Sequence, residues 1–287
     1  MTASNLYTPQ VDEVRPFADC LSAHASAIEK KAMISQIRVE HAIYSHGVEN
    51  CAIACSFGKD SMVVLHMALK VAPDIPVVWC DTKCENKFTY EFQKEITEKW
   101  KLNLNIARAP KGVDFWTIAK EYGMPKVRGE GKAREPKCCE LLKNAPSEEV
   151  YTSLGTKCIF TGVTADESRQ RFMLMARNAN KAQAEGIPAD DPDGYGCGAK
   201  YYGKMEGRYK VMPIIDWTEA DVWAYHDLME IPHCKVYDTC KGARVGCDPC
   251  TAYKSWMLRM PLQSPKTYEK VRKMKGISVL SDFEEVV

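Results

Sequence analysis

The sequence predicts a doubly wound α/β fold, in which a mostly parallel five-stranded sheet carries helices on both faces. Short apolar runs that are typical of buried strands alternate with helical patterns of about ten residues or more, an order that implies parallel strands joined by right-handed crossovers. Small or polar residues follow several of these runs, at the carboxyl ends where such sheets bind ligands. We therefore expect the functional site along that edge.

The elements follow one another regularly along the chain. Apolar residues at helical spacing predict a first helix over residues 23–45, which Gly47 ends. The predicted strands cover residues 51–55, 75–80, 102–107, 157–162 and 211–215, and two predicted helices cover residues 61–71 and 88–100. Residues 111–146 and 178–208 have irregular patterns with turn signals, and we interpret the first of these stretches as a long insertion or lid.

Length and charge indicate one enzyme domain with additions at its ends. The chain has 287 residues, enough to bury a full core. We expect an N-terminal helical segment at residues 1–48, a nucleotide-binding α/β domain at residues 49–232 and a cysteine-bearing, basic C-terminal segment at residues 233–287. The 39 basic and 38 acidic residues give a net charge of +1, which excludes a basic field over the whole surface.

The cellular location of the protein is predicted from the absence of targeting signals in the sequence. The first 15 residues contain charges and no apolar core of a signal peptide, and no uncharged run approaches the roughly 20 residues that span a bilayer. We expect a cytoplasmic protein without membrane contact. Its 13 cysteines are then thiols or metal ligands rather than a disulfide framework.

A phosphate-binding loop is the strongest local signal. Residues 56–61, Ser-Phe-Gly-Lys-Asp-Ser, lie between the first predicted strand and the following helix. In such a turn the backbone N–H groups, the helix dipole and the Lys59 ammonium all favour an anion, so the loop predicts a pyrophosphate site. Neither of the two common glycine-rich nucleotide fingerprints occurs at this turn. A simple helix cap is the alternative interpretation.

Cysteine spacing is the second signal. Cys138 and Cys139 are adjacent in the first irregular stretch, and Cys247 and Cys250 form a C-x-x-C turn. Four thiolates in two close pairs can bind either Zn²⁺ or a [4Fe–4S] cluster. Adjacent cysteines are awkward for a tetrahedral zinc site, but spacing alone does not choose between zinc and the cluster.

The loop resembles the pyrophosphate loop of the adenine-nucleotide α-hydrolase-like (PP-loop) group, and its Phe57 narrows the resemblance to the phosphoadenylyl-sulfate (PAPS) reductase family. The Cys-Cys and C-x-x-C pairs resemble those of the iron–sulfur adenylyl-sulfate reductases, and an ordered set of motifs extends the resemblance over residues 28–256. The resemblance implies a PP-loop α/β fold and an enzyme of sulfur metabolism. Its ligand would be ATP or an adenylyl-sulfate such as PAPS.

The resemblance also assigns the site residues. Nucleotide contacts are expected at Ser56, Phe57, Gly58, Lys59, Asp60, Ser61, Asp81, Gly162, Glu167, Ser168, Arg169 and Arg171. Lys59 and Asp60 would take part in catalysis, and the two arginines can fork onto phosphate or sulfate oxygens. Asp60 or Asp81 would help to hold Mg²⁺.

One departure from the family pattern concerns the reaction. The thioredoxin-dependent reductases of this family end in Glu-Cys-Gly-[Ile/Leu]-His, whose thiolate attacks the substrate sulfur. Here the last cysteine is Cys250, and residues 251–287 contain neither cysteine nor histidine. Cys240, with Lys241 and Arg244 nearby, is the candidate replacement nucleophile, and a loop cysteine without a role is the alternative.

Three functions fit these observations. The missing thiol favours ATP-dependent adenylation of an acceptor followed by sulfur transfer, as in the DNA-phosphorothioation and RNA-thiolation relatives, with a sulfur donor such as a cysteine desulfurase. The second is an adenylyl-sulfate or PAPS reductase that forms sulfite with thioredoxin. The third is a cluster-bearing nucleotide sensor or assembly subunit. A homo-oligomer is compatible with all three functions. Basic and aromatic residues over 253–275 make a nucleic acid a candidate acceptor, although a solvated helix face explains them equally well.

Overall fold

A six-stranded sheet forms the centre of the molecule. The computed structural model describes residues 27–127, 135–184, 186, 198–200 and 208–278. The strands are β1 (Cys51–Ala54), β2 (Val77–Cys80), β3 (Leu104–Ala107), β4 (Cys158–Thr161), β5 (Gly198–Lys200) and β6 (Tyr209–Val211). They lie in the order β3-β2-β1-β4-β6-β5, and all are parallel to their neighbours except β5, which runs antiparallel to β6.

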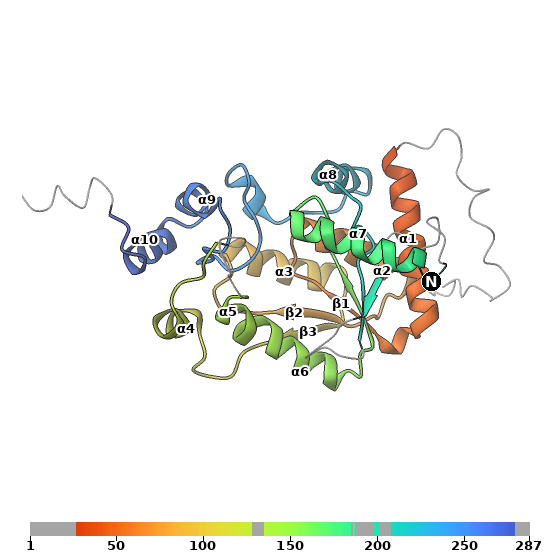
Figure 1. Cartoon of the computed structure of the whole chain (residues 1–287), viewed down its shortest axis with the longest axis horizontal. Coiled ribbons are helices and arrows are strands. Elements are labelled where there is room, and N and C mark those ends of the chain that lie inside the picture. Colours follow the sequence, from red (N-terminus) through yellow and green to blue (C-terminus); the bar gives the residue numbers. More distant parts are fainter. Residues whose placement is uncertain (1–26, 128–134, 185, 187–197, 201–207, 279–287) are drawn as a thin grey trace, which may run out of the picture.

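Helices cover both faces of this sheet (Figure 1). They are α1 (Ala27–His46), α2 (Lys59–Val71), α3 (Lys87–Lys99), α4 (Phe115–Tyr122), α5 (Lys137–Cys139), α6 (Ala145–Ser153), α7 (Arg169–Ala184), α8 (Glu219–Leu228), α9 (Trp256–Gln263) and α10 (Pro265–Met274). Three further short helical turns are η3 (Val48–Asn50), the π-type η4 (Glu140–Asn144) and η5 (Lys235–Asp238). The predicted doubly wound α/β class is thereby confirmed.

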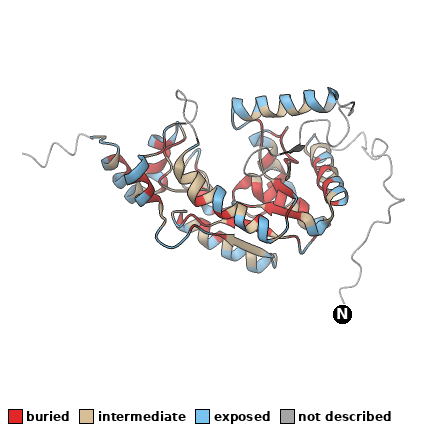
Figure 2. Ribbon diagram, turned by 60° about the horizontal axis from the view of Figure 1, so that its bottom comes forward, coloured by how far each residue is buried: buried red, intermediate tan, exposed pale blue. Residues whose placement is uncertain are grey.

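Two hydrophobic clusters show why the layers hold together. On one face, side chains of α1, α2, α3 and α8 pack with alternate residues of β1, β2 and β4 into the largest cluster, which includes the fully buried Ile53, Leu65 and Phe160. On the other face, Tyr151 of α6 packs on Ala52 and Ile159. The alternation of side chains along each strand supplies both faces, and Figure 2 shows the buried residues concentrated at the sheet.

The sequence prediction needs correction at the edge of the sheet. A sixth strand, β5, was not predicted, because three residues within a turn-rich stretch carry no measurable alternation. The fifth predicted strand, over residues 211–215, is β6 and ends at Val211. Pro213 lacks an N–H for the ladder, and the apolar residues around it are buried in a turn instead.

The stretches predicted to be irregular contain helices. Residues 111–146 include α4, where the Asp114 side chain accepts hydrogen bonds from the amides of Trp116 and Thr117, and then α5 and η4. The stretch over residues 178–208 begins inside α7, and most of the remainder lies outside the described residues, as does the predicted start of the first helix. None of the helices in the described part of the chain is long and apolar enough to cross a membrane.

Candidate functional site

The turn from β1 into α2 has the geometry of a phosphate loop. Phe57 is fully buried and has a φ of 58°, a left-handed conformation that costs free energy for a residue with a side chain. Its ring packs edge to face on Trp79, with 5.9 Å between ring centroids, and this packing offsets the strain. The Ser61 hydroxyl donates to the Gly58 carbonyl oxygen at 2.8 Å, which closes the turn at the start of α2.

The Lys59 side chain lies in an acidic environment. Its Nζ is 3.0 Å from Asp60 Oδ1 and 3.8 Å from Glu219 Oε1, at the start of α8. The lysine is only 9% exposed, so this charge is largely removed from water and is compensated by the two carboxylates. A phosphate group bound at the loop would therefore compete with both carboxylates for the ammonium.

Gly162, at the end of β4, lies against the same loop. A Cβ atom at this position would be 2.5 Å from the carbonyl carbon and oxygen of Asp60 and 2.6 Å from the amide nitrogen of Ser61. Only glycine permits this approach of backbone to backbone. The structure thus brings Gly162 to the loop, as the sequence predicted.

Asp81, at the end of β2, has hydrogen-bond donors on both carboxylate oxygens. Oδ1 accepts from the Tyr90 hydroxyl at 2.9 Å and from the Lys83 amide at 3.0 Å, while Oδ2 accepts from Arg108 Nε at 2.8 Å. Burial works to raise the pKa of Asp81, but the bonds from Arg108, the Lys83 amide and Tyr90 outweigh it and lower that pKa. A magnesium ion at Asp81 would have to displace these donors.

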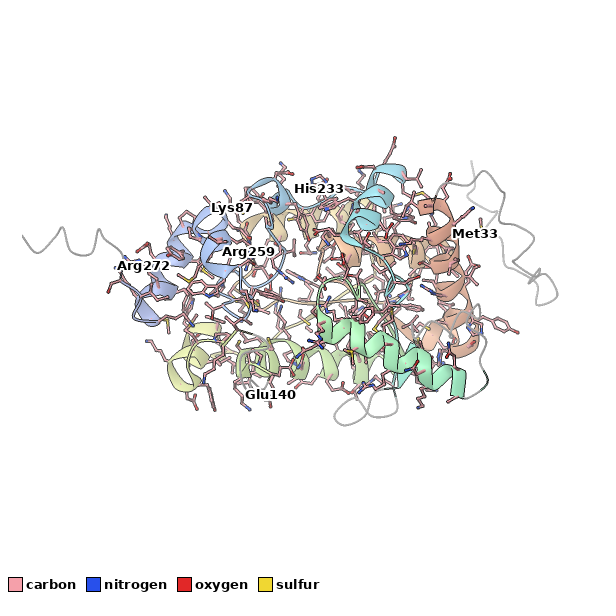
Figure 3. The ribbon with its side chains drawn as sticks, turned by 45° about the horizontal axis from the view of Figure 1, so that its top comes forward. Met33, Lys87, Glu140, His233, Arg259 and Arg272 are labelled. Carbon is pink, nitrogen blue, oxygen red and sulfur yellow. The ribbon has the colours of Figure 1, made fainter. Side chains whose placement is uncertain are left out.

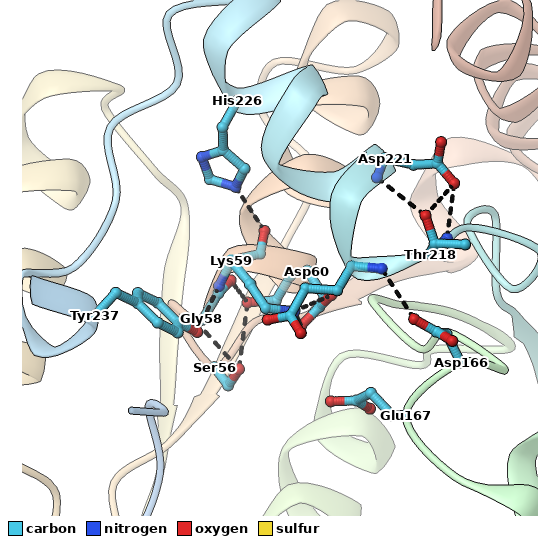
Figure 4. Close-up of polar contacts among 12 residues, drawn as sticks. Ser56, Gly58, Lys59, Asp60, Asp166, Glu167, Thr218, Asp221, His226 and Tyr237 are labelled. Carbon is cyan, nitrogen blue, oxygen red and sulfur yellow. Dashed lines mark hydrogen bonds and ion pairs between the residues drawn. The ribbon is translucent and has the colours of Figure 1, made fainter. Parts of the chain in front are cut away.

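The remaining predicted nucleotide contacts surround the start of α7. Glu167, Ser168 and Arg169 are exposed, and Arg171 forms an ion pair with Glu167 one turn away. The neighbouring Asp166 accepts a hydrogen bond from the Glu219 amide at 3.1 Å, which joins this turn to the start of α8 beside Lys59 (Figure 4).

A cavity joins the phosphate loop to the cysteine-bearing segments. Its volume is about 220 Å³. Ser56 of the loop lines it, together with Cys80, Glu85, Lys143 and Gly246. The volume is below the roughly 300 Å³ of the smallest typical ligand pockets, so a whole nucleotide would extend from the cavity across the loop.

The four cysteines predicted as metal ligands come together beside this cavity. Hydrogen bonding with Cys139 raises the pKa of Cys138, burial raises it further, and negative charge at Cys247 and Cys250 adds to the shift. The two pairs are thus within electrostatic range of one another. The amide of Cys250 donates to the Cys247 carbonyl oxygen at 3.2 Å, which forms the C-x-x-C turn.

These thiols do not form a site for a single ion. Among the residues that the structure describes, no three Cys, His, Asp or Glu side chains converge on one metal position. A zinc ion needs thiolates about 2.3 Å from a single point, whereas a four-iron cluster is several atoms wide and takes ligands that lie further apart. The donor set of four neighbouring thiols therefore fits the cluster in its chemistry.

The comparisons with known proteins agree with these features. The profile of the phosphoadenosine phosphosulfate reductase domain matches residues 50–253. The chain belongs to the PAPS reductase family. It is an enzyme of sulfur metabolism with a nucleotide-binding domain, as the sequence analysis predicted.

Individual members of the family share modest identity with the chain. The phosphoadenosine 5'-phosphosulfate reductase of Xanthomonas campestris pv. campestris (strain B100) is 28% identical over 233 residues, which cover 81% of this chain and 80% of the relative. That of Xanthomonas axonopodis pv. citri (strain 306) is 30% identical over 188 residues, 66% of each chain. Among solved structures, the PAPS reductase from Candida auris is 21% identical, with a TM-score of 0.49 over 75% of this chain and 92% of that one.

Three side chains near the predicted ligands of this family member were not found from the sequence. Cys84 hydrogen-bonds to Cys247, and this bond lowers the pKa of Cys247 well below its ordinary value. Burial opposes the shift, and the positive charge of Lys143 adds to it. The Cys84 carbonyl oxygen accepts from the Asp248 amide at 2.8 Å. Glu85 is buried against the same thiol, and burial, together with the negative charge at Cys247, raises its pKa to about 8. Lys143 follows Cys139 by four residues, a helical spacing that could have indicated it.

Cys240, the predicted replacement nucleophile, lies elsewhere. It is half-buried and packs against the main hydrophobic cluster. It is not among the residues that line the cavity, and the thiols that do line it are Cys55 and Cys80. Burial raises the pKa of Cys80, while Ser147 Oγ lies 3.3 Å from its sulfur.

The C-terminal helices bury several of the basic and aromatic residues over 253–275 that the sequence analysis linked to nucleic-acid binding. Arg259 and Arg272 lie in α9 and α10 (Figure 3) and are only 4% and 5% exposed. Trp256 is buried with Met260 and Val271 in a small cluster of their own. Its ring is therefore not free to stack on an unpaired base, and the exposed basic residues of this segment are lysines such as Lys266 and Lys270.

Proposed function

We propose that this enzyme binds an adenine nucleotide with its phosphates on residues 56–61, adenylates an acceptor and replaces the adenylyl group with sulfur. The observation that carries the proposal is a single cavity that is lined by Ser56 of the loop and by Glu85 and Lys143, two side chains that lie next to the cysteines. One cavity can therefore hold the reacting end of the nucleotide and the group that delivers sulfur.

The reaction would proceed in two displacements. An acceptor oxygen attacks the α-phosphorus of ATP, the bond to the β-phosphate oxygen breaks, and pyrophosphate leaves. A donor such as a cysteine desulfurase would supply sulfur as a persulfide, and a dithiol such as reduced thioredoxin would release it as hydrosulfide and become a disulfide. The hydrosulfide then attacks the acceptor carbon, and AMP leaves with the oxygen. Lys59 and the loop amides would stabilise negative charge on the phosphates, and Asp60 would help to hold Mg²⁺.

A [4Fe–4S] cluster on Cys138, Cys139, Cys247 and Cys250 forms part of the proposal. It is supported by the proximity of the four thiols. When bound, the cluster would supply redox chemistry or an iron that binds sulfur. The lysine at position 143 would hold the negative charge of the ligands close to the cavity.

The reductase reaction is the second candidate, because the similar Xanthomonas proteins are named PAPS reductases and the match covers 80% of the length of one of them. It needs an accessible thiolate that is free to attack the substrate sulfur. Among the described residues, the thiols that line the cavity away from the proposed ligands are Cys55 and Cys80. Burial makes both poor nucleophiles, because it raises the pKa of Cys55 to about 11 and also raises the pKa of Cys80. This observation favours sulfur transfer.

Two assays on anaerobically purified protein separate the candidates. In the first, ATP and candidate acceptors are supplied, and AMP and pyrophosphate are measured; we expect both products in equal amounts. In the second, PAPS or adenylyl-sulfate is supplied with reduced thioredoxin, and we expect little or no sulfite. Rapid thioredoxin-dependent sulfite release would contradict the proposal and establish the reductase. If that release were lost on Cys240→Ser with iron retained, Cys240 would be the nucleophile despite its position.

A further inference from the structure

Two side chains from the C-terminal half of the domain hold the peptide groups of Lys59 from opposite sides. The Lys59 amide donates to the Tyr237 hydroxyl oxygen at 2.9 Å. The Lys59 carbonyl oxygen lies 2.9 Å from His226 Nε2, which donates to it (Figure 4). The loop lysine is thus held through its backbone by residues about 170 positions later in the chain, as the separations of 178 and 167 residues show.

A shared aromatic neighbour fixes both of these side chains. The Trp223 ring lies 5.3 Å from the His226 ring and 5.3 Å from the Tyr237 ring, centroid to centroid, and meets the tyrosine edge to face at 89°. His226 is only 3% exposed, and its Nδ1 lies 3.1 Å from the Ile231 carbonyl oxygen. The tyrosine ring is therefore restrained by packing, independently of its hydroxyl group.

The amide that Tyr237 occupies is one that a phosphate would use. Lys59 is the first residue of α2 after the N-cap Gly58, so its N–H has no partner within the helix. Such N–H groups bind phosphate oxygens at helix N-termini. The hydroxyl also lies close to the loop backbone, because a Cβ atom on Gly58 would be only 3.1 Å from it. The Tyr237 oxygen and a phosphate oxygen thus cannot both take this hydrogen bond at full strength.

We propose that the Tyr237 hydroxyl is an internal competitor for the phosphate loop, which a phosphoryl oxygen displaces from the Lys59 amide. The inference rests on the proposed nucleotide site and adds a residue that tunes its affinity. The hydroxyl oxygen moves only with its ring, so the exchange needs a small tilt of the Tyr237 ring against Trp223, while His226 retains the carbonyl side of Lys59. Tyr237 belongs to η5, nine residues before Gly246 at the cavity, so loop occupancy is also linked to the segment that carries Cys247.

Calorimetric titration with inorganic pyrophosphate and with ATP tests this role in the full-length protein. Tyr237→Phe removes the hydroxyl and keeps the ring. Because a neutral hydrogen bond contributes a net of about 0.5 to 1.5 kcal/mol, we expect the variant to bind both ligands about two- to tenfold more tightly than the wild type. A residue that merely supported the fold would not increase affinity when truncated.

Tyr225→Phe is the matched control. Its hydroxyl lies 3.0 Å from Nδ1 of His66, seven residues after Lys59 in α2, and its loss should leave affinity unchanged. Weaker binding by Tyr237→Phe would overturn the competition and make the hydroxyl a ligand of the phosphate, and equal binding would also overturn it. If neither the wild type nor the variant bound pyrophosphate, ATP or PAPS, the proposed nucleotide site itself would fail, and this inference with it.

Discussion

The cavity is lined by Ser56 of the phosphate loop and by Glu85, Lys143 and Gly246, which neighbour the cysteine group. The loop and the cysteine group are built in different ways. The loop comes from one continuous segment, β1 into α2, whose hydrogen bonds are mostly between residues a few positions apart. The cysteine group is assembled from three distant segments around Cys84, Cys138 and Cys247, joined by contacts such as the bridge between Glu85 and Cys247. Local sequence therefore determines the first region, whereas the whole fold determines the second.

This difference predicts unequal responses to substitution. A change at one of the four proposed ligand cysteines should remove the cluster altogether, because each of these thiols would supply one of its four bonds. A change in the loop should weaken binding by a finite factor, because several backbone N–H groups remain.

The largest effect is expected for Cys247→Ser. Serine is a poor ligand for iron, so iron in anaerobically purified protein should fall from about four atoms per chain to less than one, and the brown colour should be lost. Cys51→Ser is the control, since that thiol lies in the main hydrophobic cluster, where it donates to the Gly47 carbonyl oxygen at 3.2 Å and hydrogen-bonds with Cys158, bonds that serine can also make. Colourless wild-type protein with one zinc per chain would show that the cluster assignment is wrong.

Lys59→Ala should have the next largest effect. It removes a charged hydrogen-bond donor from the phosphate site, a contribution of about 1.5 to 3 kcal/mol, so nucleotide affinity should fall about tenfold to a hundredfold. Lys70→Ala, in the last turn of the same helix, should leave affinity unchanged. Affinity is measured by calorimetry. If Lys59→Ala bound every adenine nucleotide as tightly as the wild type does, the loop would be only a helix cap.

Gly162→Ala tests the contact between β4 and the loop. A methyl group 2.5 Å from the Asp60 carbonyl must displace backbone, which should lower the free energy of unfolding by about 1 to 3 kcal/mol and weaken nucleotide binding as well. Gly123→Ala meets no atom within 4 Å but has a φ of 82°, so it should cost stability by strain alone and leave binding intact. Denaturant unfolding and calorimetry on both variants separate the two causes, and unimpaired nucleotide binding by Gly162→Ala would be inconsistent with this contact.

The smallest effect concerns pH and the scaffold beneath the loop. Burial, with additional repulsion from Lys70 and His226, lowers the pKa of His66 to about 4 from an ordinary 6.5. The folded state thus disfavours the charged ring, and the free energy of unfolding should fall as pH decreases from about 6.5 toward 4. His66→Phe removes this titration, so its stability should fall less over the same range in denaturant titrations. An equal decrease in both proteins would assign the pH effect to other groups.

The same contrast explains what the sequence could predict. The strand, the turn and the helix around Ser56 and Lys59 follow from local patterns. Gly162 was assigned through the family resemblance, and its backbone contact with the loop appears only in the fold. Cys84, Glu85 and Tyr237 meet their partners only through tertiary contacts across more than 150 residues, and no spacing rule records such a meeting. Cys240 remains a prediction, since its basic sequence neighbours suggested reactivity and it is not among the residues that line the cavity.

The central claim is that the loop and the cysteine group form one site. The most direct test is the Mössbauer spectrum of anaerobically purified, iron-57-labelled protein before and after saturation with ATP or PAPS. We predict that nucleotide bound at the loop changes the spectrum of the cluster, and that Lys59→Ala requires a higher nucleotide concentration for the same change. A spectrum that stays the same while calorimetry shows the nucleotide to be bound would contradict a shared site.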